Sequence, residues 1–251
     1  IDQKGILIRS SCHISVYYDI ANVFNGDLFA LKGDNALGLK FTIPFQMDYQ
    51  SWYYPDYKKM AIIVSAADNN TITINSPKDL NGIQAGQEIQ LTLNAGETYM
   101  IQNNSSNPGS GPGGVVVRAN KPIAVTIADD SVNLPGNGCA DTVGDQLIPD
   151  DLAGNEFVLT RGYLYLADAF YVFATADSTA IYLAGNLVDN INAGEFYSGR
   201  LNDQSVYIET SAPVHVLQVS GFGCELGGAI IPALGCTGSE SVAVTRATTQ
   251  D

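Results

Sequence analysis

Short stretches of this sequence occur twice in the same order, and this recurrence limits the architecture more than any other property of the chain. The stretch "AADNNTITI" at 66–74 returns as "TADSTAIYL" at 175–183, and "NAGETYMI" at 94–101 returns as "NAGEFY" at 192–197. Similarity that recurs at a long interval is the sign of a chain that builds one structural unit more than once. The sequence therefore predicts a tandem repeat.

One longer stretch occurs three times, as "GILIRSSCHISV" at 5–16, "GVVVRANKPIAV" at 114–125 and "SVYIETSAPVHV" at 205–216. Each copy consists of a β-branched run, a small polar segment and a second alternating run. This pattern predicts a β-hairpin in each copy. Pro122 and Pro213 follow the predicted turn, where a fixed φ angle can start the second strand.

A second repeated element follows these stretches. "LKGDNALGLKFTI" at 31–43 returns as "LIPDDLAGNEFVL" at 147–159 and, more loosely, as "IIPALGCTGSESVAV" at 230–244. We expect one repeat at about 5–104, a second at about 114–202 and part of a third at about 205–246, with roughly eight short strands per unit. Because the first residues read like the middle of a repeat, we expect a processed or trimmed part of a longer protein.

The character of the strands predicts an all-β fold of tandem antiparallel sheets. "MAIIVSA", "GGVVVRA" and "YVFATA" are apolar nearly throughout, as in strands that are covered on both faces, whereas "TITIN" and "IQLTL" alternate. No segment shows a sustained helical period. Eight strands per unit fit two four-stranded blades of a β-propeller-like arrangement, which we favour, or one Greek-key β-sandwich.

Composition narrows the class of partner. The chain of 251 residues carries 12 Lys and Arg residues against 26 Asp and Glu residues, a formal net charge of -14. Such a surface repels phosphate groups, so we expect no nucleic-acid binding. No apolar run reaches the roughly 18 residues that a spanning helix needs, so we also expect no membrane insertion.

The four cysteines are Cys12, Cys139, Cys224 and Cys236. Cys224 and Cys236 flank a glycine-containing loop that can bring its ends together, so we expect a disulfide between them. Cys12 and Cys139 are then the remaining pair. An even cysteine count in an acidic, Asn- and Thr-rich chain favours an oxidising, extracellular compartment.

The sequence gives no pattern for a catalytic centre, and we expect none. The two histidines, His13 and His215, stand at positions that other residues fill in the other copies, which favours structural or surface roles. No nucleophile elbow, zinc motif or phosphate loop occurs. We therefore expect a protein that is not an enzyme.

A calcium ion is the one cofactor for which the sequence offers a candidate. Asp129, Ser131 and Asn133 follow the alternate spacing with which oxygen ligands converge on a hard cation in a loop. Leu134 and Ala140 depart from the EF-hand pattern at the glycine and glutamate positions. The alternative is an ordered polar loop without a metal.

An aromatic insertion at 47–59 is the candidate ligand-binding segment. It contains Trp52, Tyr53, Tyr54 and Tyr57, and the second copy replaces it with the shorter "TRGYLYLADAF". Exposed Trp and Tyr side chains dominate protein interfaces and also stack on sugar rings. The alternative is that these rings cover the end of a sheet or contact a neighbouring domain.

The order of "ADNNTITI", "NAGETY", "VVVRANKPIAV" and "LIPDDLAGNEF" resembles the N-terminal domain family of the IgGFc-binding protein, over about 5–244. The resemblance implies a secreted or surface-anchored repeat module of large adhesin-like bacterial proteins. For a protein of the Bacteroidota it implies export by a type IX route. The resemblance supplies no catalytic residues, because the matched positions are turn and strand residues.

These observations together predict an extracellular or cell-surface module for adhesion or protein binding. The expected partners are a host or matrix protein, a surface glycan, or neighbouring domains of the same long protein. Three alternatives stay open: a carbohydrate-binding module that uses the Trp52 loop, a structural spacer, and a glycoside hydrolase. Carboxylates that converge in a central pocket favour the hydrolase, and smooth loops without a pocket favour the spacer.

Overall fold

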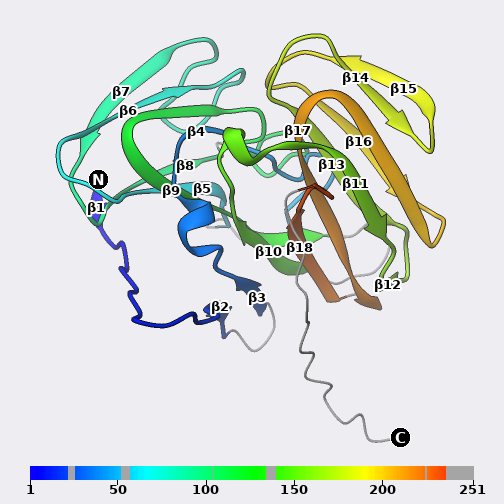
Figure 1. Ribbon diagram of the computed structural model, residues 1–251, viewed down its shortest axis with the longest axis horizontal. Coiled ribbons are helices and arrows are strands. Elements are labelled where there is room, and N and C mark those ends of the chain that lie inside the picture. The colour runs from blue at the N-terminus through cyan, green and yellow to red at the C-terminus, as the bar shows by residue number, and fades with distance from the viewer. Residues whose placement is uncertain (22–25, 52–56, 104, 134–139, 224, 236–251) are drawn as a thin grey trace, which may run out of the picture.

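A computed structural model describes residues 1–21, 26–51, 57–103, 105–133, 140–223 and 225–235, and Figure 1 shows it as an almost entirely β-sheet protein. The strands described form two eight-stranded sheets and one two-stranded ribbon. The helical elements in these ranges are two short 3-10 turns, η1 (Gly33–Ala36) and η2 (Asp150–Leu152). The predicted all-β class is confirmed.

The first sheet is organised around one long strand. Its strands are β1 (Asp2–Gln3), β4 (Gly38–Thr42), β5 (Lys59–Ser65), β6 (Asn70–Asn75), β7 (Glu88–Leu93), β8 (Glu97–Gln102), β9 (Val116–Asn133) and β10 (Ala140–Gln146). The start of β9 pairs with β4 and β6, and the rest of β9 pairs with β5 and β10. The sheet therefore curls into two arms, whose inward side chains share one hydrophobic core.

The second sheet repeats this plan. Its strands are β11 (Gly154–Thr160), β12 (Tyr163–Leu164), β13 (Asp168–Ala174), β14 (Thr179–Leu183), β15 (Asn186–Ile191), β16 (Phe196–Leu201), β17 (Ser205–Gly223) and β18 (Glu225–Ile231). The long strand β17 pairs with β11 and β14 near its start and with β13 and β18 further on. We call residues 33–146 unit 1 and residues 150–231 unit 2.

The two units agree in register as well as in strand order. Ile63 of β5 pairs with Val125 of β9, and its sequence counterpart Val172 pairs with Val216. The first strand of each unit also carries an irregularity after its first residue, at Gly38 in β4 and at Gly154 in β11. The segments matched between units 1 and 2 at these positions therefore form the same structural elements.

The repeated stretch at 66–74 and 175–183 builds the same turn in both units. The Asp68 carboxylate accepts the amide of Ala95 at 3.0 Å, and the Asp177 carboxylate accepts the amide of Ala193 at 3.1 Å. The next residue, Asn69 or Ser178, has a positive φ angle, 51° and 56° respectively. Asn and Ser tolerate a left-handed turn, because their short polar side chains can form hydrogen bonds with the backbone nearby.

The predicted hairpins at 114–125 and 205–216 are wrong. The structure has one continuous strand at each place, β9 with 18 residues and β17 with 19 residues. The polar segment of β9 is a bend, which the buried Asn70 holds by donating to the carbonyl oxygens of Lys121 and Pro122. The bend moves the long strand from one arm of the sheet to the other. The two halves of the strand therefore pair with different strands and not with each other.

The two units pack against each other through the middle of unit 2. Alternate residues of β13 belong to different cores: Phe170 and Val172 face the core of unit 2, whereas Tyr171 and Phe173 face that of unit 1. All seven residues of β13 are buried, which confirms the prediction from its apolar sequence. The predicted four-stranded blades are not confirmed, because β9 and β17 join their neighbours into eight-stranded sheets.

A small ribbon precedes unit 1. The strands β2 (Tyr17–Ile20) and β3 (Asp27–Ala30) pair with each other. β3 lies against β10, and β10 in turn lies against β18, at the lower centre of Figure 1. Three strands from three successive segments of the sequence therefore lie one after the other across the molecule.

Candidate functional site

The seam between β3, β10 and β18 is built from aspartates that bind the next strand. The Asp27 carboxylate on β3 accepts the amide of Gly144 on β10 at 2.8 Å. Two carboxylates on β10 then bind amides of β18: Asp145 accepts from Ile230 at 2.7 Å, and Asp141 accepts from Leu226 at 2.8 Å. The amides concerned belong to strands of different sheets, so these carboxylates satisfy donors that no sheet partner binds.

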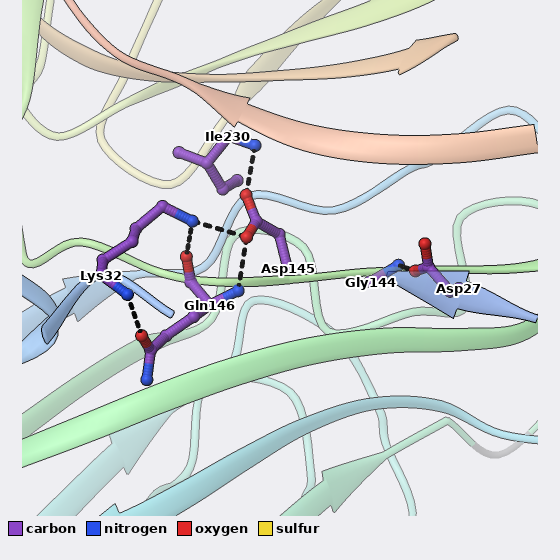
Figure 2. Close-up of polar contacts among 6 residues, drawn as sticks. All are labelled: Asp27, Lys32, Gly144, Asp145, Gln146 and Ile230. Atoms are coloured by element: carbon purple, nitrogen blue, oxygen red, sulfur yellow. Dashed lines mark hydrogen bonds and ion pairs between the residues drawn. The ribbon is translucent and has the colours of Figure 1, made fainter. Parts of the chain in front are cut away.

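Lys32 supplies the positive charge of this seam. Figure 2 shows its Nζ atom between the Asp145 carboxylate and the Gln146 carbonyl oxygen, while its amide donates to the Gln146 side chain. Burial lowers the pKa of Lys32 and raises the pKa of Asp145, and the ion pair between them opposes both shifts. The pair therefore holds the start of unit 1 against its last strand, close to unit 2.

Among the titratable groups of the seam, Asp27 has a large shift in its pKa. Burial, which outweighs the hydrogen bonds from Leu28 and Gly144, raises the pKa of Asp27 to about 6. The carboxyl group lines a hollow of about 340 Å³, together with Leu28, Gln218, Ser220 and the glycines of β18. Asp27 is the one titratable side chain among the residues that line it, so this hollow lacks the pair of carboxylates that a glycoside hydrolase needs.

Asp150 joins the two units at a second place. Its carboxylate accepts the amide of Thr42 at 2.6 Å and the hydroxyl of Thr42 at 2.8 Å, both from β4 of unit 1. Lys40 lies 3.0 Å from Oδ2, and Nε2 of His215 on β17 lies 3.1 Å from Oδ1. Burial acts to raise the pKa of Asp150, but the contacts with His215, Lys40 and Thr42 outweigh it and lower this pKa to about 2.

The histidines have the roles that the sequence predicted for them. His215 is buried and binds Asp150 within the unit junction, and His13 is exposed. Neither has a nucleophile among the hydrogen-bond partners that the structure shows in the described ranges. The prediction that the protein is not an enzyme stays a prediction.

The three candidate calcium ligands lie on β9. Asp129 is buried, and its carboxylate accepts from Gln46 at 2.7 Å and from Ser51 at 2.8 Å. Burial raises the pKa of Asp129, while the nearby Lys59 ammonium opposes the shift. The amide of Ser131 also donates to this carboxylate, at 3.3 Å, so the Asp129 oxygens accept from Gln46, Ser51 and Ser131. The calcium site stays a prediction.

The aromatic insertion is described only in part. Trp52, Tyr53 and Tyr54 lie outside the described residues, and Tyr57 is half-buried. Tyr49, earlier in the same segment, is buried at the contact with unit 2, where its hydroxyl accepts from Arg200 at 2.8 Å. Tyr49 therefore contacts the neighbouring unit, and the ligand-binding role of Trp52, Tyr53, Tyr54 and Tyr57 stays a prediction.

The predicted disulfides also fall outside the description. Cys139, Cys224 and Cys236 are not among the described residues, and Cys12 is exposed. Both pairings stay predictions.

The segment that replaces the insertion in unit 2 exposes a group of aromatic rings. Tyr163, Tyr165 and Phe222 have exposed fractions of 78%, 75% and 73%. β12 pairs in parallel with the end of β17, which places Tyr163 opposite Phe222 with 6.4 Å between their ring centroids. Leu164 is buried, because alternate side chains of a strand point to opposite faces. We call Tyr163, Tyr165 and Phe222 the aromatic patch.

Sequence reasoning missed this patch. The alternation in "GYLYLAD" at 162–168 was a usable signal, because it separates two tyrosines from two leucines. What the sequence did not contain was the pairing of β12 with β17, which brings Phe222 beside Tyr163. The patch is contiguous in space but comes from segments far apart in the chain.

The fold and these surfaces define a class: an all-β repeat module whose successive units are joined by buried aspartates and which displays loops at the sheet ends. The family model described as "IgGFc binding protein" matches residues 30–244. The chain therefore belongs to the IgGFc-binding family.

The other comparisons add little. No curated protein matches this chain. One solved structure, described as "anti-sigma factor domain-containing protein", aligns over 74% of this chain and 81% of that chain, with 12% identity and a TM-score of 0.23. A likeness at that level carries no conclusion about fold or function. Among the described residues, no helix is long and apolar enough to cross a membrane.

Proposed function

We propose that this chain is an extracellular, non-catalytic module of a larger surface protein, and that it binds a protein partner through the aromatic patch. Its family is described by a protein-binding activity. The observation that carries the proposal is the exposure of Tyr163, Tyr165 and Phe222 at one end of the second sheet. Contiguous exposed aromatic rings mark interaction sites on soluble proteins, and Tyr is enriched among the residues that dominate binding energy.

The local structure holds the patch ready for binding. The amide of Tyr165 donates to the carbonyl oxygen of Gly223 at 2.9 Å, and the Tyr165 ring lies over this glycine. Gly223 has a φ angle of 63°, a conformation that glycine adopts without strain. The backbone beneath the rings is therefore fixed on both sides, so a partner has little loop entropy to remove when it binds.

The test compares binding by the wild-type chain and by a triple variant, Tyr163→Ala, Tyr165→Ala and Phe222→Ala. The probes are the Fc fragment of immunoglobulin G, which the family description names, and a panel of fibronectin, collagen and laminin, each passed over the immobilised chain. We expect the triple variant to lose at least about 30-fold in affinity for the bound probe, because such residues each contribute about 1 kcal/mol or more. Its melting temperature should stay within about 2 °C of the wild type.

The matched control is Leu187→Ala with Val188→Ala on β15, two exposed apolar residues outside the patch. This variant should bind as the wild type does. Full binding by the triple variant would refute the role of the patch. A wild-type chain that binds neither Fc nor any member of the panel would contradict the protein-binding proposal itself.

A structural spacer is the second candidate, and one observation favours it. The hydrophobic core of unit 1 continues without a break into β13, β17 and β18 of unit 2. Shared cores of this kind make a stiff array in which each unit supports its neighbour. One scaffold can serve both as a spacer and as a binding module. The binding test above shows whether the chain binds a partner in addition to its role as a spacer.

A further inference from the structure

The segment at 5–16 repeats the sequence of β9 and β17 but has none of their partners. Its residues Ile6, Ile8 and Ile14 have exposed fractions of 83%, 49% and 57%. Their sequence counterparts in unit 1 are Val115, Val117 and Ile123, each fully buried at 0%. In Figure 1 the dark blue chain between β1 and β2 runs along the outside of the molecule with no strand paired to it.

The ribbon β2–β3, which follows this segment, resembles the end of unit 1 in its hydrogen bonding. The amide of Leu31 donates to the carbonyl oxygen of Val16 at 2.9 Å, and the amide of Leu147 donates to that of Val125, also at 2.9 Å. The ribbon β2–β3 therefore occupies the place of the second half of β9 and of β10 in a unit. β3 lies on β10 as β10 lies on β18.

The start of the segment also sits where a preceding unit would place it. The amide of Gly5 donates to the carbonyl oxygen of Gly96 at 2.9 Å, and a Cβ atom on Gly5 would lie 2.8 Å from that oxygen. Gly114, the counterpart of Gly5, also lies close to Gly194, with 2.3 Å between its Cβ position and the Gly194 oxygen, although its amide donates to Ile43. The close glycine approach between units 1 and 2 thus recurs between Gly5 and unit 1.

A face of unit 1 lacks the cover that its counterpart has. Ile62 and Val64 on β5 are only half-buried. Their counterparts Tyr171 and Phe173 on β13 are fully buried, at 0% exposure, because unit 1 packs over them. The half-covered face of β5 is therefore the place where a unit ahead of unit 1 would pack.

We propose that residues 5–21 and 26–30 belong to the long strand and last strand of a further repeat unit, and that 5–16 form a docking surface for strands equivalent to β4, β5 and β6. The occupant is a further copy of this repeat unit. It would pair with both edges of 5–16 and cover the exposed face of β5. Its strands carry the pattern of 38–75, because these are the segments that occupy the same positions on β9.

The experiment supplies the occupant from the protein itself. A second copy of residues 31–113 is fused directly before Gly5, so that the join reproduces the natural connection between 113 and 114. Hydrogen exchange is then followed by mass spectrometry on the fusion and on the unfused chain. In the unfused chain the amides of 6–16 should exchange at nearly the rate of an unstructured peptide, and in the fusion they should exchange at least about 100-fold more slowly.

The matched control is the double variant Ile8→Asp and Ile14→Asp. In the unfused chain it should leave the melting temperature unchanged, because both side chains are exposed. In the fusion it should abolish the new protection of 6–16. The corresponding substitution in β9, Val117→Asp, should destabilise the unfused chain strongly, because this position is buried.

Unchanged, rapid exchange of 6–16 in a folded fusion would overturn the proposal. A melting temperature that falls as far in Ile8→Asp with Ile14→Asp as in Val117→Asp would also overturn it, since the segment would then already be part of a packed core. If the fusion does not fold, a separate peptide of residues 38–75 is added to the unfused chain. Slowed exchange of 6–16 supports the proposal, and exchange that stays rapid at a saturating peptide concentration contradicts it.

Discussion

Replacing Asp150 with Asn should show how strongly one carboxylate joins the two units. The side chain keeps its shape, and its amide oxygen can still accept one of the two hydrogen bonds of Thr42, so the main change is the loss of the negative charge beside Lys40 and His215. The contacts that lower the pKa of Asp150 from 3.8 to about 2 stabilise its charged form in the folded state. Because a pKa shift of one unit corresponds to about 1.4 kcal/mol, this shift amounts to roughly 2 kcal/mol of stability at pH 7.

The dependence on pH gives the sharper test. Because the pKa of Asp150 is lower in the folded than in the unfolded chain, its contribution is fully present above about pH 4. It is lost as the pH falls towards 2, where the unfolded chain binds a proton that the folded chain does not. Between pH 4 and 2 the wild type should therefore lose about 2 kcal/mol more than Asp150→Asn does.

The assay is guanidinium unfolding followed by circular dichroism, at pH 7 and in steps from pH 5 to 2. Asp34→Asn serves as the control, because Asp34 is the sequence counterpart of Asp150 in unit 1 and is exposed. The control should change stability by no more than about 0.5 kcal/mol. If Asp150→Asn costs no more than the control, or if its stability falls in parallel with the wild type below pH 4, the carboxylate does not join the units as argued.

Two further predictions concern the same junctions. Burial raises the pKa of Asp27 to about 6, so its contribution to stability falls as the pH rises from 4 to 6. Asp27→Asn should remove this fall, which amounts to roughly 1 kcal/mol with partial exposure allowed for, and an unchanged dependence on pH in a denaturant titration would contradict the prediction. Gly38→Ala should cost about 1–3 kcal/mol, because the new Cβ would lie 2.2 Å from Cβ of Pro149. Gly227→Ala, with no atom within 4 Å, is its control, and equal melting temperatures would contradict the prediction.

The sequence predicted those parts of the fold that depend on local chemistry. The turn at Asp68 recurs at Asp177, because the side chains that form it are written in both copies. The apolar run of β13 correctly indicated a strand that is buried on both faces. The residues that form β13 are consecutive in the chain. The residues that form the turn belong to two short motifs that both occur in each copy.

The predictions from sequence failed where a residue's contact partner lies far away in the chain. A polar segment between two β-branched runs looks the same whether it forms a hairpin turn or a bend in one strand. Asn70 decides the outcome for β9 by binding the backbone of Lys121 and Pro122 from another strand. The aromatic patch has the same cause, since Phe222 reaches Tyr163 only through the pairing of β12 with β17.

The junctions explain why the units form a continuous array. The last strands β3 and β10 offer carboxylates to the next last strand, and Gly5 and Gly114 each lie against a glycine of the following unit. Such contacts act only between neighbours, so the stability of the array is set unit by unit. The segment between β4 and β5 of unit 1 corresponds in chain order to the segment between β11 and β13 of unit 2. In unit 1 that segment is the aromatic insertion, and in unit 2 it carries two rings of the aromatic patch. A binding surface can therefore vary from one unit to the next while the junctions, and with them the scaffold, stay constant.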